Sequence, residues 1–92
     1  MTAQEFEVKW TRYPDGKLAF SENRFRVARV AHAVRDRLRE GRTPESARER
    51  VLEEPYYRED LGSAFSVADG GPDSMKNMQE LLDDFNSIDS VD

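Results

Sequence analysis

The 92-residue sequence contains no cysteine, a single histidine and no long apolar run. The absence of cysteine excludes disulfides, thiolate metal sites and a cysteine nucleophile, and it is compatible with a reducing compartment. No stretch approaches the roughly 20 apolar residues that a membrane span requires. The N-terminal sequence MTAQEFEVKW also lacks the basic and apolar regions of a signal peptide. We therefore expect a cytoplasmic protein that does not enter a membrane.

Sequence signatures of catalysis and of cofactor binding are missing as well. His32 is the only histidine, and no G-x-S-x-G nucleophile motif accompanies it. The glycines of the DGGP sequence lack the spacing of a phosphate-binding loop, and the scattered carboxylates do not follow the pattern of a calcium loop. We expect a protein that is not an enzyme and needs no metal or cofactor, and an enzyme or enzyme accessory subunit is the least favoured class.

The net charge of −5 is unevenly distributed along the chain. Residues 1–43 carry a net charge of +4, residues 44–68 carry −3 and residues 69–92 carry −6. Opposite charges at the two ends favour contact between them, or contact of each end with a different partner.

The first twenty residues alternate in the way that a β-hairpin does. Phe6, Val8 and Trp10 fall on one side of EFEVKWTRY, and the sequence KLAF alternates again after the turn sequence PDG. The register that fits this pattern places Trp10 opposite Phe20. We predict an antiparallel hairpin whose longer first strand leaves a free edge, through which a homo-oligomer could form.

Helices are predicted after the hairpin. Ser21 is the expected N-cap of the first helix and Gly41 its stop, and Thr43 with Pro44 marks the start of a second helix. Pro55 interrupts the pattern before a short further helix. The apolar stripe of the first of these helices consists of Val27, Val30, Ala31, Val34 and Leu38. The predicted fold is therefore α+β, a small single domain with an N-terminal hairpin followed by three to four helices.

The acidic segment after the DGGP break carries the strongest periodic signal. A helix is predicted at about residues 74–88 because apolar residues recur there at helical spacing, namely Met75, Met78, Leu81, Leu82, Phe85 and Ile88. We accordingly divide the chain into a core domain at residues 1–68 and an acidic C-terminal segment at residues 69–92. A helix of this length is marginal alone in water, so its apolar face must dock on its own domain or on another chain.

These features favour a small protein–protein interaction module, such as a regulator, an inhibitor or an assembly subunit. Its partner would be a protein with a basic surface, contacted partly through the acidic helix, and an acidic surface of this kind could also mimic nucleic acid. The candidate partner-binding residues are Met78, Leu81, Leu82, Asp83, Asp84, Phe85, Tyr56 and Tyr57.

The alternative hypothesis is a nucleic-acid-binding regulator. It would use the arginine-rich helix at residues 24–42, with the acidic tail as an autoinhibitory or partner-binding arm. The candidate phosphate-binding residues are Arg24, Arg35, Arg39 and Arg42. This alternative is less favoured because the arginines are spread around the helix and the whole domain is acidic, so that long arginine stems covering the edges of the core explain them as well.

Overall fold

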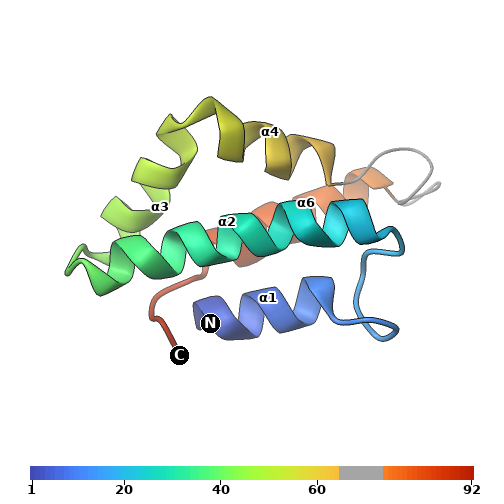
Figure 1. The fold of residues 1–92 in the computed structure, drawn as a ribbon, viewed down its shortest axis with the longest axis horizontal. Helices are drawn as coiled ribbons and strands as arrows, with labels where there is room; N and C mark the ends of the chain where they lie inside the picture. Colours follow the sequence, from blue (N-terminus) through green and yellow to red (C-terminus); the bar gives the residue numbers. More distant parts are fainter. Residues whose placement is uncertain (65–73) are drawn as a thin grey trace.

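The computed structural model describes residues 1–64 and 74–92, which form five helices and contain no β-strand (Figure 1). The predicted α+β fold is therefore wrong, and the described chain is all-helical. The DGGP break lies outside the described residues. The helices are α1 (Ala3–Thr11), α2 (Ser21–Arg39), α3 (Pro44–Glu53), α4 (Pro55–Ser63) and α6 (Ser74–Asn86).

α1 occupies the sequence that was expected to form the first strand. The Thr2 hydroxyl accepts a hydrogen bond from the Glu5 amide at 2.9 Å, and the Glu5 carboxylate accepts one from the Thr2 amide at 2.8 Å. This capping box satisfies two backbone donors at the start of the helix. Phe6 and Trp10 are completely buried, whereas Val8 is 43% exposed. The burial therefore follows a helical period, because a strand would turn Val8 to the same side as Phe6 and Trp10.

Residues 12–20, which include the predicted second strand, form a loop. Leu18 is buried, but Phe20 is 48% exposed and serves as the N-cap of α2 instead of facing Trp10 across a sheet. The Gly16 amide donates to the Arg12 carbonyl, and a Cβ on Gly16 would lie only 2.6 Å from that oxygen. The strand edge through which a homo-oligomer was expected to form is thus absent, since α1 and this loop replace both strands.

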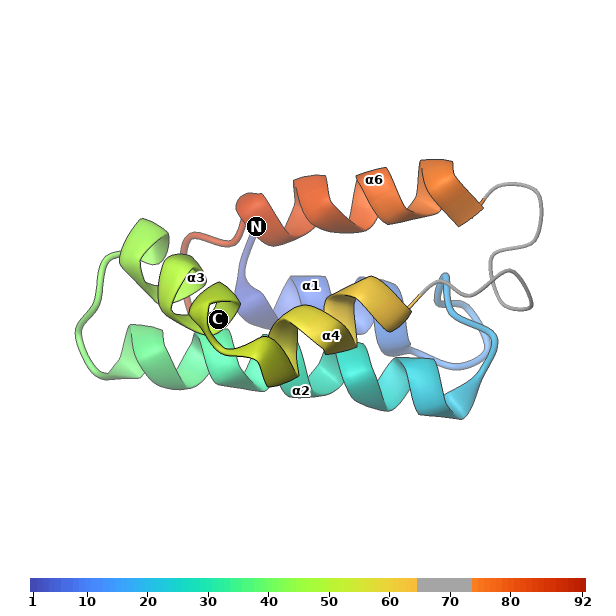
Figure 2. The same cartoon turned by 90° about the horizontal axis from the view of Figure 1, so that it is seen from above.

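α2 is the longest described helix and packs against α1, α3 and α4. Figures 1 and 2 together show α2 and α6 on opposite sides of the molecule, with α1 and α4 enclosing the space between them. The buried side of α2 contains most of the predicted stripe, including Val27, Val30 and Val34. Ser21 is the first helical residue and not the cap, because Phe20 takes that position without a side-chain hydrogen bond.

The start signal of α3 acts as the sequence predicted. Thr43 caps α3 by accepting a hydrogen bond from the Ser46 amide at 3.1 Å, and Pro44 follows at the first helical position. Gly41 has a φ of +94°, a left-handed conformation that suits glycine after a helix. Pro55 begins α4, so the two helices meet at a sharp bend.

α6 closes the core on the side away from α2 (Figure 2). Its side chains Leu81 and Phe85, together with Ile88 just beyond it, are at most 1% exposed. The Phe85 ring packs edge-to-face on Phe6 of α1, with ring centroids 6.3 Å apart. The helix expected at about residues 74–88 is observed at Ser74–Asn86. Within the described part of the chain, no helix is long and apolar enough to cross a membrane.

Candidate interaction surfaces

The predicted partner-binding residues divide into an inward and an outward group. Leu81 and Phe85 are buried in the core of their own chain, and Met78 and Tyr57 are partly buried against that core. These four side chains are therefore covered by the rest of the molecule. They offer little surface to a second protein in this conformation.

Leu82, Asp83 and Tyr56 make up most of the outward group. Leu82 lies on the solvent side of α6, and Asp83 beside it accepts a hydrogen bond from the Gln79 amide at 2.9 Å. The Tyr56 ring is 55% exposed and carries the Arg29 guanidinium 5.4 Å from its centroid. These residues lie on different helices, α6 and α4, so the structure does not combine them into the single surface that the sequence suggested.

Asp84 is half-buried between α6 and α1. It accepts a 2.9 Å hydrogen bond from the Trp10 indole and forms an ion pair with the Lys9 ammonium at 2.6 Å. Glu80, one turn earlier, pairs with Lys9 at 3.1 Å and with Lys17 at 3.7 Å. The hydrogen bond to Asp84 is the largest cause of the raised pKa of Lys9, and Glu80 adds to it. The opposite charges of the two ends of the chain thus meet within one molecule.

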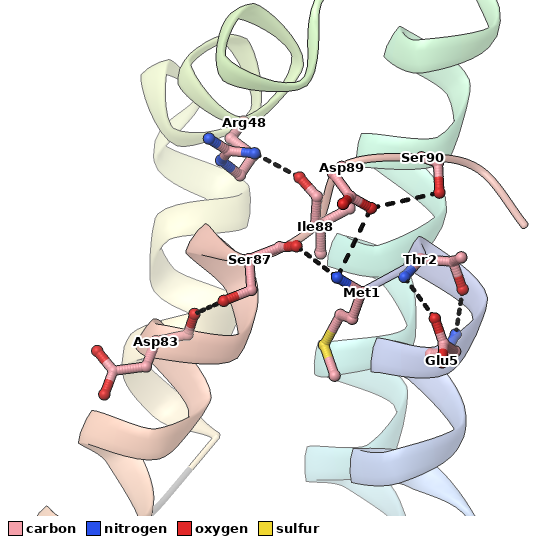
Figure 3. A network of polar contacts seen from close by, with 9 residues as sticks. All are labelled: Met1, Thr2, Glu5, Arg48, Asp83, Ser87, Ile88, Asp89 and Ser90. Carbon is pink, nitrogen blue, oxygen red and sulfur yellow. Dashed lines mark hydrogen bonds and ion pairs between the residues drawn. The ribbon is translucent and has the colours of Figure 1, made fainter.

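The two ends of the described chain are joined by a network of polar contacts (Figure 3). The Met1 ammonium donates to the Ser87 carbonyl at 2.7 Å and lies 3.6 Å from the Asp89 carboxylate. Thr2 and Ser90 form an isolated parallel bridge, next to which the Ala3 amide donates to the Ser90 carbonyl at 2.8 Å. This seam holds the residues after α6 against the start of α1.

α3 also reaches the segment after α6. The Arg48 guanidinium donates to the Ile88 carbonyl, as Figure 3 shows. The Ser87 hydroxyl donates a 2.8 Å hydrogen bond to the Asp83 carbonyl in the last turn of α6. Since Ile88 itself is buried, this contact fixes the position where the chain leaves the helix.

The four arginines of the nucleic-acid hypothesis have different surroundings. Arg24 donates to the carbonyls of the 12–20 loop, and Arg42 contacts Glu40 at 3.6 Å and the Ser46 hydroxyl at 3.3 Å. Arg35 lies 3.5 Å from His32. Arg39 is exposed and has no ion-pair partner among the described residues. The structure therefore does not gather the four into one free basic stripe.

Several other arginines bind carboxylates of their own chain. Arg29 forms a bidentate pair with Asp60 at 2.9 and 3.2 Å, and Asp60 is only 6% exposed. Arg26 pairs with Glu22, Arg37 with Glu54 and Arg50 with Glu53. Much of the basic charge of the described helices is therefore matched internally.

His32 lies on the surface between α1 and α2. Its Nε2 is 2.8 Å from a Glu7 carboxylate oxygen, and its side chain is more than half exposed. In the described part of the chain the other polar contact of the His32 ring is with the Arg35 guanidinium, so no hydroxyl group is bonded to this pair there. Among residues 1–64 and 74–92, no group of three or more histidine, aspartate or glutamate side chains is placed to hold a metal ion.

A surface that the sequence analysis did not identify lies at the end of the molecule where α1 leads into α2. Tyr13 is 73% exposed, Phe25 67% and Phe20 48%. The Arg24 guanidinium lies 4.9 Å from the centroid of the Tyr13 ring, and Arg24 and Phe25 line the same depression. We call Tyr13, Phe20, Arg24 and Phe25 the Arg24 patch.

The Arg24 patch borders a shallow depression of about 290 Å³. The residues lining it are Thr11, Ser21, Arg24, Phe25 and Ala28. A signal for the patch was present in the sequence. Phe25 precedes Val27 by two residues, so on a helix it falls about 200° away from that buried position and cannot join the core stripe.

Comparisons with known proteins add no assignment to this geometry. No protein-family model, no curated protein sequence and no solved structure matches this chain. Any function must therefore be argued from the residues described above.

Proposed function

We propose that this chain is a small, non-enzymatic protein-interaction module that contacts its partner through the Arg24 patch. The observation that carries this proposal is the exposure of three aromatic side chains close in sequence to one arginine, namely Tyr13, Phe20 and Phe25, with the Tyr13 ring against the Arg24 guanidinium and Phe25 lining one depression with Arg24. Aromatic and arginine side chains dominate the binding energy of protein interfaces. Exposed apolar surface on a small domain marks such interfaces more often than isolated exposed residues do.

The acidic helix has a smaller part in this proposal than its sequence suggested. Leu81 and Phe85 support the core, so α6 offers a partner only its outward residues, Leu82 and Asp83, with Met75 at its start. These residues would form a secondary contact for a basic partner surface. We also propose a cytoplasmic location, with which a chain free of cysteine is compatible, and a fluorescent fusion imaged in its native cell would test it.

Site-specific photo-crosslinking tests the proposed function. A photoreactive phenylalanine analogue would replace Phe25 in one version of the chain and Tyr56, an exposed aromatic residue on α4, in a matched control. Irradiation in the native cell should give a protein adduct of defined mass from position 25 and not from position 56. An adduct of equal yield from both positions, an adduct with nucleic acid, or no adduct at position 25 would each contradict the proposal.

A further inference from the structure

We infer, on the basis of the proposed protein-binding function, that the Arg24 patch recognises an acidic peptide segment carrying one large apolar side chain. The carboxylate would bind the Arg24 guanidinium, and the apolar side chain would enter the adjoining depression. Three observations support this inference: the fixation of Arg24, its lack of an ion-pair partner in the described part of the chain, and the size of the depression.

Arg24 is held in place without being neutralised. Its Nη1 donates to the Leu18 carbonyl at 3.2 Å and to the Ala19 carbonyl at 2.6 Å, and the Tyr13 ring lies against the guanidinium. These contacts leave the Nε–H and Nη2 donors without a hydrogen-bond partner among the described residues. A guanidinium has five donors in a rigid fork that fits a carboxylate, and an arginine already held in place loses less entropy on binding.

The arginines of α2 are only partly paired, because Arg24, Arg35 and Arg39 have no ion-pair partner among the described residues, and of these three Arg24 is the one that lies against an aromatic ring. Arg26, Arg29 and Arg37 each pair with a carboxylate of their own chain. Arg24 has no such partner among the described residues, and neither does Arg12, which is exposed and immediately precedes Tyr13. Two cations without an ion-pair partner among the described residues, on the stretch of chain that carries three exposed rings, are complementary to a partner that brings negative charge.

The depression is suited to a single side chain. Its volume of about 290 Å³ lies just below the range of about 300–1,000 Å³ that is typical of small-molecule pockets. Its lining combines the apolar residues Phe25 and Ala28 with the polar residues Thr11, Ser21 and Arg24. A leucine or aromatic side chain from an extended peptide fits this combination better than a complete cofactor does.

A peptide is favoured over nucleic acid because of the charge of the whole molecule. The chain has a net charge of −5. A nucleic acid carries a phosphate at every nucleotide, so the acidic protein surface outside the patch would repel it. A short segment with one or two carboxylates would bind Arg24 and be attracted by the exposed Arg12, which precedes Tyr13, and it adds little further repulsion. Exposed aromatic rings near arginine can also stack on bases, so an oligonucleotide is the comparison that the experiment must include.

Selection from a random peptide library displayed on phage tests the inference. Peptides of about twelve residues, long enough to cross the patch in an extended conformation, would be selected on the full chain and counter-selected on its Phe25→Ala variant. We expect the enriched sequences to place aspartate or glutamate within about two or three residues of leucine, phenylalanine or tryptophan. Enrichment without an excess of acidic residues, or no enrichment at all, would overturn the inference.

The affinity of one enriched peptide then separates charge from shape. Arg12→Glu should weaken its binding by about tenfold or more, whereas Arg58→Glu on α4, with the same change of charge, should alter it by less than about twofold. Raising the salt concentration from about 50 to about 300 mM should also weaken binding severalfold. Arg12 donates no side-chain hydrogen bond within the described chain, so its substitution tests charge without releasing the loop, and a thermal melt of each variant checks that it is folded.

Four further outcomes would decide against the inference or against both proposals. Equal effects of Arg12→Glu and Arg58→Glu would show that only overall charge matters and would overturn the inference. Tighter binding of a single-stranded thymidine oligonucleotide than of any selected peptide would overturn it in favour of nucleic acid. A photo-crosslinked protein whose contact segment is not acidic would overturn the inference but leave the proposed function standing, whereas the absence of any protein adduct at position 25 would remove both.

Discussion

The indole N–H of Trp10 donates a 2.9 Å hydrogen bond to Oδ2 of Asp84, and this bond joins α1 to α6 across 74 positions of the chain. The same carboxylate binds the Lys9 ammonium at 2.6 Å, whereas the carboxylate of the neighbouring Asp83 faces solvent and accepts a hydrogen bond from the Gln79 side chain. Two adjacent aspartates on one helix therefore have different roles. Asp84 connects two helices of the chain, and Asp83 remains accessible.

Asp84→Ala should destabilise the fold far more than Asp83→Ala. Removing the acceptor of a charge-assisted hydrogen bond that is partly buried should lower the free energy of unfolding by about 2 kcal/mol. Removing the exposed carboxylate of Asp83 should change it by less than about 0.5 kcal/mol. Urea denaturation of both variants measures the difference. Equal losses would show that Asp84 does not hold α6 to α1.

Alanine substitutions on the inward and outward faces of α6 should also differ in their effect on stability. Phe85→Ala should lower the free energy of unfolding by about 3–4 kcal/mol, because it leaves a cavity against Phe6. Leu82→Ala, on the solvent side, should cost less than about 1 kcal/mol. Thermal melts monitored by circular dichroism give both values. A Phe85→Ala variant as stable as Leu82→Ala would mean that α6 does not close the core in solution.

Breaking the Arg29–Asp60 pair by removing one partner should destabilise the fold, whereas replacing both partners should not. Arg29→Met would leave the nearly buried Asp60 carboxylate without its partner and should cost about 2–4 kcal/mol. The double variant Arg29→Met with Asp60→Leu removes both charges and should recover most of that loss. Denaturation curves for the single and double variants test this coupling. A double variant less stable than Arg29→Met alone would contradict it.

Alkaline pH should weaken the contact between Lys9 and α6. The pKa of Lys9 is raised above its ordinary value of 10.5 by Asp84 first and by Glu80 second. A raised pKa stabilises the folded state fully below that ordinary value, and the contribution disappears as pH rises through the folded-state pKa. The free energy of unfolding should therefore fall above about pH 10.5 less steeply in Lys9→Gln than in the parent chain. Lys76→Gln, on the exposed side of α6, is the control and should follow the parent chain; a Lys9→Gln curve that also follows it would refute the assignment.

Two glycine substitutions should change the free energy of unfolding in opposite directions. Gly16→Ala would place a Cβ 2.6 Å from the Arg12 carbonyl oxygen, so the loop that presents Tyr13 must shift. We expect a loss of about 1–3 kcal/mol and altered NMR shifts of the Tyr13 ring. Gly62→Ala meets no atom within 4 Å and lies in α4, so it should stabilise the chain by about 0.5–1 kcal/mol. A Gly16→Ala variant as stable as the parent chain would show that the loop is not tightly closed.

The sequence predicted the helices whose ends carry explicit signals and failed where two periods fit the same residues. Thr43, Pro44 and Gly41 act through local geometry, so their roles follow from residue type. In the first ten residues, Phe6 and Trp10 suit a strand and a helix equally well, and Val8 decides between them only when its exposure is known. The Thr2–Glu5 capping box was the local signal that favoured a helix.

The candidate surfaces were harder to predict because they depend on tertiary packing. The periodicity of α6 identified an apolar face but not the surface that it covers, which is set by Phe6, Trp10 and Lys9 far away in the sequence. The exposure of Phe25 follows from helix geometry alone, whereas that of Tyr13 and Phe20 depends on the loop that replaces the hairpin. Sequence patterning therefore indicates which residues share a face more readily than it indicates the neighbour of that face.

The seam between the start of α1 and the residues after α6 has a consequence for the order of folding. The contact of Met1 with Ser87 spans 86 positions, whereas α2, α3 and α4 follow one another through short connections. Closing a long loop costs more chain entropy than closing a short one, and contacts distant in sequence slow folding. We expect α6 to dock last and to detach first, so that the earliest opening of the native state exposes Phe6 and Trp10. Aggregation during refolding should then begin at the uncovered face of α1.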